Sequence, residues 1–332
     1  MYGAFENLLD EIKDDERFRP DLVVYIGGHI VSKKLKSYLR SLKGVEQIRI
    51  SQEADIEDTF MHLTKVMDLP NSDAMSWLDN FGWHNQWEDY RKLWMDALAK
   101  SYERKENFKP EFSSLATVKE FFSQLQKVEP QDFKAFTLGG KDAQDDGIYD
   151  RKFDTFLPGM MSSVFSGNSS AIRLMNLYAD RHVYCNRGVN GIEGSLSTAV
   201  GFSMCKNKSD KHVYCVLGDL SFFYDQNALW NRNLNGKLRI IVLNNGGGAI
   251  FGKFQGLKES QAREEMIMAK HHATAEGICS QNEVKYLAAH TMEEMEQGIS
   301  QLIHAESERP MLLEVFTDMD VDNEMLEAIQ KC

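Results

Sequence analysis

The sequence predicts an α/β protein with two Rossmann-like domains, each built on a doubly wound parallel sheet. Short apolar runs rich in β-branched residues alternate with helical segments, as expected when strands are buried on both faces of a parallel sheet. Two such stretches flank a long helical segment rich in aromatic residues. We therefore expect a first domain over residues 1–80 and a second domain over residues 81–332.

The first domain is expected to open with a short acidic helix over residues 5–18 and a buried strand over residues 21–28. A helix from about residue 30 to 42 and a strand at residues 45–51 would complete a βαβ unit. The glycines that end the first strand do not form the GxGxxG motif of dinucleotide sites. The sequence therefore gives no reason to expect a nucleotide in this domain.

After Pro70 aromatic residues recur at roughly helical spacing, and we interpret this segment as the connection into the second domain, with plain core packing as the alternative. A further helix is predicted over residues 113–126. The stretch from residue 129 to 156 lacks periodicity, so we expect an irregular surface loop that is either functional or mobile.

From residue 162 onward strands and helices alternate again, which predicts the sheet of the second domain. The expected strands cover residues 162–167, 182–185, 212–217, 238–243, 284–287 and 311–315. The expected helices cover residues 170–179, 195–206, 222–234, 262–271 and 292–305.

Two strands of the second domain end in polar residues, at the edge where open α/β sheets bind ligands. One ends in Gly218-Asp219, and the other ends in Asn244-Asn245, followed by three glycines. A carboxylate, an amide oxygen and a backbone carbonyl suit octahedral Mg²⁺, with phosphate and water completing the shell. The N–H groups of the helix after Asp219 would face the same phosphate. The pattern predicts a magnesium-diphosphate site.

The two pairs, with 24 residues between Asp219 and Asn244, resemble the fingerprint of the thiamine-diphosphate (ThDP) enzymes. The resemblance implies that the second domain has the ThDP diphosphate-binding fold and that the cofactor is ThDP. It also implies that Asp219, Asn245 and the carbonyl of Gly247 hold Mg²⁺ or Mn²⁺. The residues at the cofactor diphosphate would be Gly218, Asp219, Leu220, Ser221 and Asn245.

Leu220 replaces a glycine common in the family, a departure shared by one branch. Three blocks, at residues 167–173, 186–201 and 218–225, resemble that branch, the 2-succinyl-5-enolpyruvyl-6-hydroxy-3-cyclohexene-1-carboxylate synthases of menaquinone biosynthesis. The resemblance implies a ThDP- and Mg-dependent transferase. Such an enzyme decarboxylates 2-oxoglutarate and adds the succinyl semialdehyde unit to isochorismate.

The same resemblance gives Ile192 a catalytic role as a wedge beneath the cofactor, which brings the pyrimidine amine close to the thiazolium C2 proton. Ile250 and Phe251 would line the cofactor pocket. For all three residues the alternative is a place in an ordinary hydrophobic core. His271 and His272 lack metal-ligand spacing, so we expect them in solvent or in the core.

Ser169, Arg173 and Arg187 match family positions that bind substrate carboxylates. Arginine suits this task because its planar fork grips a carboxylate at two points and keeps its charge. Lys33 and Lys34 resemble a basic pair that the family also turns toward substrate. Surface ion pairs and solvated lysines are the alternatives for these cations.

The resembled family has a further N-terminal domain, whose glutamate activates the pyrimidine ring, and its cofactor lies between two subunits. The resemblance covers only the middle and C-terminal domains. We therefore expect a homo-oligomer, dimer or tetramer, and weak cofactor binding without turnover by this chain alone.

Net charge, cysteine spacing and the length of apolar runs limit the partners and the location that we expect for this protein. The net charge of −12, with no basic tract to offset it, argues against nucleic acid. Five cysteines without CxxC spacing predict a reducing, cytoplasmic location. No apolar run approaches the length of a membrane span, and the N-terminus lacks the apolar region of a signal peptide.

Two other functions stay open. Another ThDP-dependent 2-oxoacid decarboxylase or ligase would take a smaller substrate, for which paired arginines at 173 and 187 are unexpected. A non-catalytic binding module with a degenerate ThDP fold would have no physical need to keep both Asp219 and Asn245.

Overall fold

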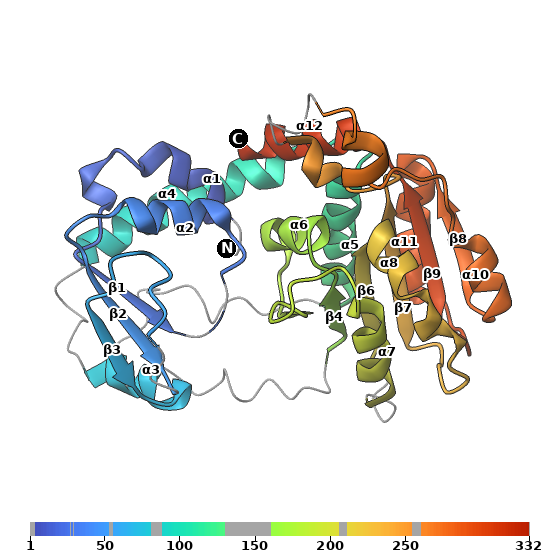
Figure 1. Ribbon diagram of the computed structural model, residues 1–332, viewed down its shortest axis with the longest axis horizontal. Helices are drawn as coiled ribbons and strands as arrows, with labels where there is room; N and C mark the ends of the chain where they lie inside the picture. Colours follow the sequence, from blue (N-terminus) through green and yellow to red (C-terminus); the bar gives the residue numbers. More distant parts are fainter. Residues whose placement is uncertain are drawn as a thin grey trace. The chain divides into compact units, whose positions relative to one another are not determined.

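The computed structural model describes residues 4–26, 28, 30–52, 56–80, 88–129, 161–205, 211–253 and 260–331 (Figure 1). Of the predicted loop at 129–156, residues 130–156 lie outside the described residues. Residues 81–87 of the aromatic segment also lie outside them. The chain forms two compact units. One comprises residues 1–108 and 328–332, and the other comprises residues 109–327.

The first unit contains a parallel sheet in the order β1-β2-β3, with helices packed on both of its faces. The helix between β1 and β2 begins where Ser32 accepts a hydrogen bond from the N–H of Leu35, at 3.0 Å. β3 was not predicted from the sequence, because it is a four-residue strand with a single β-branched residue. The elements are α1 (Ala4–Ile12), η1 (Glu16–Phe18), β1 (Leu22–Ile26), α2 (Lys33–Ser41), β2 (Glu46–Ser51), β3 (Lys65–Asp68), α3 (Asn71–Asn80) and α4 (Glu88–Asn107).

The units divide after Phe108, whereas the sequence analysis placed the domain boundary near residue 80. The difference comes from α4, whose apolar side packs against α1 and α2. Trp94 of α4 contacts the ring of Phe18 edge to face, with centroids 5.3 Å apart. An aromatic helix that looks like a connection in sequence thus supplies part of the core of the first unit.

The second unit is built on a six-stranded sheet in the order β5-β4-β6-β7-β9-β8, and every pairing in it is parallel. The chain starts this sheet at β4 and then extends it on both sides, which is the doubly wound arrangement predicted from the sequence. All six strands lie where they were expected: β4 (Ser163–Ser166), β5 (Val183–Cys185), β6 (Val213–Gly218), β7 (Leu238–Asn244), β8 (Lys285–Ala289) and β9 (Met311–Phe316).

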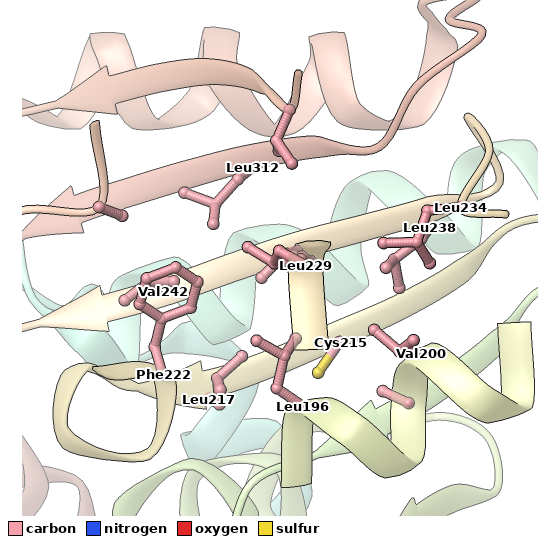
Figure 2. Packing of buried hydrophobic residues seen from close by; sticks show 14 of the residues in the cluster. Leu196, Val200, Cys215, Leu217, Phe222, Leu229, Leu234, Leu238, Val242 and Leu312 are labelled. Carbon is pink, nitrogen blue, oxygen red and sulfur yellow. The ribbon is translucent and has the colours of Figure 1, made fainter. Parts of the chain in front are cut away.

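Helices cover both faces of this sheet because successive residues of a strand point to opposite sides. Cys215 of β6 faces the layer of α7, η5 and α10, where Figure 2 shows Leu196 and Val200 of α7 close to the strands. Tyr214, its neighbour, faces the layer of α5, α6 and α11 and contacts Phe121 at 5.1 Å between centroids. The elements are α5 (Ser114–Val128), α6 (Ser170–Tyr178), α7 (Ser195–Cys205), η5 (Gln226–Trp230), α10 (Glu276–Gln281) and α11 (Met292–His304).

Two predicted helices of the second unit are shorter than expected. The segment 222–234 is divided into α8 (Asp219–Tyr224) and η5, since the side chain of Asp225 between them accepts hydrogen bonds from Ser197 of α7. The segment 262–271 contains only a π-helical turn, η7 (Arg263–Ile267). Two further helices, α10 and α12 (Met319–Gln330), were not predicted, although Asp318 caps α12 by accepting from the N–H groups of Asp320 and Val321.

No helix in the described part of the chain is long and apolar enough to cross a membrane. Four cysteines are described, and each is a free thiol: Cys185, Cys205, Cys215 and Cys279.

Candidate functional site

The predicted site residues of the second unit gather at one edge of its sheet. Strands β5, β4, β6 and β7 are consecutive neighbours and parallel, so their carboxyl ends meet at the same edge. Asn168 and Ser169 follow β4, Arg187 follows β5, Asp219 follows β6, and Asn245 follows β7. Topology alone therefore brings residues from four separate stretches of sequence together.

Asp219 is buried and joins the ends of two strands. Its Oδ1 accepts a hydrogen bond from the N–H of Leu220 at 2.6 Å. Its Oδ2 accepts from the N–H groups of Gly246 and Gly247, each at 2.9 Å. The carboxylate that starts α8 is thus held by three backbone donors, two of them from the glycine turn that follows β7.

The glycine turn requires residues without a side chain. Gly246 has φ of 81° and Gly247 has φ of 149°, values that L-residues rarely adopt. A Cβ at Gly247 would also lie 2.6 Å from the carbonyl oxygen of Met268. The turn is fixed on its other side by the N–H of His271, which donates to the carbonyl of Gly246 at 2.9 Å.

Asn244 stabilises the glycine turn through its side-chain amide. Its Nδ2 donates to Oε1 of Glu314 at 2.7 Å and to the carbonyl of Ala273 at 3.0 Å, and its Oδ1 accepts from the N–H of Gly246 at 3.1 Å. Glu314 is fully buried, and its Oε2 accepts from the hydroxyl of Tyr286 at 2.7 Å. Burial and the hydrogen bond to Glu314 raise the pKa of Tyr286. Asn244 is therefore part of the scaffold of the site.

Asn245 is held by a second carboxylate. Its Nδ2 donates to Oδ2 of Asp322 at 2.8 Å. Asp322 also accepts from the N–H and the hydroxyl of Ser114, each at 2.7 Å, and from the hydroxyl of Thr317 at 3.0 Å. Burial raises the pKa of Asp322, while these four hydrogen bonds act in the opposite direction.

His271 lies beside Asp219, which the sequence analysis did not predict. Its Nε2 is 3.3 Å from Oδ2 of Asp219, and its Nδ1 accepts from the N–H of Ala273 at 3.1 Å. Because Nδ1 is an acceptor, the proton of the neutral ring sits on Nε2. Nε2 makes no well-aligned hydrogen bond within the described residues. The nearby Asp219 carboxylate nevertheless raises the pKa of His271, and burial opposes this shift.

Three further residues next to Asp219 are predicted to lie at the cofactor diphosphate: Gly218, Leu220 and Ser221. Ser221 is buried, Leu220 is half-buried, and a Cβ at Gly218 would meet no atom within 4 Å. Gly167, at the end of β4, approaches the same region so closely that a Cβ there would lie 2.9 Å from the Cβ of Leu217.

Asn168 connects two predicted parts of the site and was missed by the sequence analysis. Its Oδ1 accepts from Nη1 of Arg187 at 2.8 Å, and its Nδ2 donates to the carbonyls of Asn186 at 3.1 Å and Gly191 at 2.6 Å. Ile192, the residue after Gly191, is half-buried. The guanidinium of Arg187 and the loop that carries Ile192 are thus anchored to the same buried amide. The sequence points to Asn168 only through its position within the block at residues 167–173, which resembles the synthases.

Ser169 adopts φ of 64° and ψ of −122° at the start of α6 and makes no side-chain capping hydrogen bond there. Such a conformation in a non-glycine residue costs about 1–3 kcal/mol and is concentrated at functional sites. Arg173 lies one turn further along α6 and is half-buried. Nε of Arg187 is buried and has no hydrogen-bond partner within the described ranges.

Four other predicted site residues lie outside the strand ends described above. Ile250 is half-buried and Phe251 is exposed, both in η6 (Ala249–Lys253) after the glycine turn. Lys33 and Lys34 begin α2 in the first unit, where Nζ of Lys34 lies 2.6 Å from Oδ2 of Asp10. A role for these four residues toward cofactor or substrate stays a prediction.

Comparison with known proteins places the site in a recognised domain. Residues 166–315 match the thiamine pyrophosphate enzymes, in their C-terminal TPP binding domain, where thiamine pyrophosphate (TPP) is the same compound as ThDP. The matched range includes the ends of β4, β5, β6 and β7.

Curated relatives extend the similarity to nearly the whole chain, and among them are the 2-succinyl-5-enolpyruvyl-6-hydroxy-3-cyclohexene-1-carboxylate synthases of three bacteria. That of Phocaeicola vulgatus is 33% identical over 322 aligned residues, covering 94% of this chain and 49% of the relative. That of Bacteroides thetaiotaomicron is 33% identical over 313, covering 92% and 49%. That of Christiangramia forsetii is 32% identical over 338, covering 98% and 52%. The chain spans about half the length of these relatives.

Proposed function

Since residues 166–315 match the C-terminal TPP binding domain of the thiamine pyrophosphate enzymes, we propose that this chain forms part of a 2-succinyl-5-enolpyruvyl-6-hydroxy-3-cyclohexene-1-carboxylate synthase of menaquinone biosynthesis. The proposed reaction decarboxylates 2-oxoglutarate and transfers the remaining four-carbon unit to isochorismate, with ThDP and Mg²⁺ as cofactors. The observation that carries the proposal is the joining of Asp219 to the glycine turn across two adjacent strand ends.

The residues present fit a magnesium-bound diphosphate. Asp219 and Asn245 bring a carboxylate and an amide to neighbouring strand ends, and oxygen ligands of this kind are what Mg²⁺ prefers. The Nδ2 of Asn245 is already bound to Asp322, which leaves its Oδ1 for a cation. Gly247 would contribute its carbonyl, from a turn that excludes any side chain.

When bound, the thiazolium of ThDP would accept the electrons released on decarboxylation. In this proposal Ile192 would support the cofactor, and Gly218, Leu220 and Ser221 would hold its diphosphate. Ile250 and Phe251 would line the cofactor pocket.

The substrates are proposed to bind through their carboxylates. Arg187, held in place by Asn168, and Arg173 would receive them together with Ser169. Positive charge must be placed locally because the chain as a whole carries a net charge of −12. Lys33 and Lys34 are proposed as further substrate contacts, with Lys34 exchanging its partner Asp10 for substrate. We further propose a cytoplasmic homo-oligomer.

Calorimetric titration of ThDP, with and without Mg²⁺, tests the site directly. We expect binding that requires Mg²⁺ in the wild-type chain. Binding that is equally tight without Mg²⁺ would contradict the proposed metal role.

The substrates need a separate assay, because the chain spans half of its relatives. Consumption of 2-oxoglutarate and of pyruvate would be compared after supplying the N-terminal half of a relative. Preference for pyruvate would favour another ThDP-dependent decarboxylase, and cofactor binding without either reaction would favour a binding module.

A further inference from the structure

We propose that Asp322 is a positioning residue that sets the orientation of the Asn245 side-chain amide, so that the amide oxygen and not its nitrogen faces the metal. This inference rests on the proposed function, in which Oδ1 of Asn245 is a ligand of Mg²⁺. Nothing in the spacing of the sequence motif points to Asp322, which lies 77 residues after Asn245.

The contact itself selects one orientation. Oδ2 of Asp322 lies 2.8 Å from Nδ2 of Asn245. An ionised carboxylate only accepts hydrogen bonds, so the NH₂ end of the amide is the end that can face it. If the amide were flipped, its oxygen would face the oxygen of the Asp322 carboxylate, with no hydrogen bond between them. Its NH₂ group would then face the cation, and an amide NH₂ group cannot be a metal ligand.

Asp322 is itself fixed by contacts from other elements. The N–H and hydroxyl of Ser114, at the start of α5, donate to its two oxygens at 2.7 Å. The hydroxyl of Thr317, just after β9, donates to Oδ2 at 3.0 Å. Together with Asn245, every one of these partners is a donor, which is the pattern expected around a carboxylate anion.

Asn244, the neighbouring residue, is oriented by a carboxylate in the same way. Nδ2 of Asn244 donates to the buried carboxylate of Glu314 at 2.7 Å. Its Oδ1 is thereby turned away from Glu314 and accepts from the N–H of Gly246 at 3.1 Å. Two consecutive asparagines are thus each held by a separate carboxylate, one serving the glycine turn and the other the metal.

The first test is Asp322→Asn, which keeps the size of the side chain but can face Asn245 with either an oxygen or an NH₂ group. Residues that orient metal ligands typically contribute 10- to 100-fold to metal affinity. We expect Mg²⁺-dependent ThDP binding, measured by calorimetry, to weaken by about that factor. The control is Asp318→Asn, an exposed carboxylate at the start of the same helix, where asparagine also caps well.

A double variant separates positioning from a general structural role. Asn245→Asp alone places two carboxylates at hydrogen-bonding distance, so we expect it to weaken binding. In Asp322→Asn with Asn245→Asp, the new amide at position 322 can donate to the new carboxylate at position 245. We expect the double variant to recover binding relative to either single variant. Additive loss in the double variant would contradict the proposal.

A measurement without cofactor keeps the test independent of the proposed function. The side-chain NH₂ signals of Asn245, assigned by their loss in Asn245→Asp, should be protected from solvent exchange in the wild type. In Asp322→Asn they should lose that protection while the signals of Asn244 stay unchanged. Unchanged Asn245 signals would overturn the inference, whether or not ThDP binds. A wild-type chain with the expected signals but no Mg²⁺-dependent ThDP binding would argue against the proposed function alone.

Discussion

Oδ2 of Asp219, at the end of β6, accepts a hydrogen bond from the backbone N–H of Gly247, beyond the end of β7, at 2.9 Å. The two residues are 28 positions apart, and the parallel pairing of their strands brings them together. This contact makes the carboxylate and the glycine turn one structural unit, so a change on either side should affect both stability and binding.

Asp219→Asn tests the carboxylate side of this unit. The amide keeps one acceptor but loses the charge that attracts Mg²⁺ and that strengthens the hydrogen bonds from Gly246 and Gly247. We expect Mg²⁺-dependent ThDP binding to be lost and the free energy of unfolding to fall by about 1–3 kcal/mol. Calorimetry and urea denaturation measure the two effects. The exposed Asp320, changed to Asn, should alter neither.

Gly247→Ala tests the turn side. The added Cβ would meet the carbonyl of Met268 at 2.6 Å, and φ of 149° is strained for alanine. We expect a loss of about 1–3 kcal/mol in urea denaturation and weaker cofactor binding. Gly277→Ala is the matched control, because no atom lies within 4 Å of its Cβ and α10 should gain up to about 1 kcal/mol from alanine. Equal stability of the two variants would contradict the strain argument.

The sequence was sufficient for the six strands of the second unit and for the short polar motifs that follow two of them. Strands such as β6 and β7 are buried on both faces, so they appear as continuous apolar runs. Asp219 and Asn245 belong to short motifs that sit directly after these strands. Both features are local in sequence, and local patterns are what a single sequence reveals.

The supporting residues could not be found in this way. Asp322 lies 77 residues from Asn245, and Glu314 lies 70 residues from Asn244, so each pairing arises only through the sheet order. His271 contacts Asp219 because the segment after η7 folds back on Gly246. Glu314 did leave a usable signal, since a charged residue inside an apolar strand must find partners.

His212 should make the stability of the second unit depend on pH. Burial, together with the nearby Arg239, lowers the pKa of His212 to about 4. The unfolded chain, with a pKa of about 6.5, then binds a proton between pH 6.5 and 4 that the folded chain does not bind. The stabilisation is complete above pH 6.5 and is lost as the pH falls toward 4.

Urea denaturation between pH 4 and 7.5 would measure this effect. After allowance for solvent screening of a partly exposed ring, we expect a loss of roughly 1–2 kcal/mol over the window. His212→Gln should flatten that part of the profile, and the exposed His304, changed to Gln, should leave it unchanged. The same slope in His212→Gln would assign the dependence to other groups.

Asn168→Asp tests whether the buried side-chain amide of Asn168 holds the loop that carries Ile192. Aspartate at this position still accepts from Arg187, but it cannot donate to the carbonyls of Asn186 and Gly191 and would repel them. We therefore expect faster hydrogen–deuterium exchange in residues 186–194 and a free energy of unfolding lower by about 1–3 kcal/mol. Asn190→Asp, an exposed position in the same loop, is the control. If the loop exchanges at the wild-type rate in Asn168→Asp, the hydrogen bonds from Asn168 to the loop carbonyls are not what keeps the loop in place.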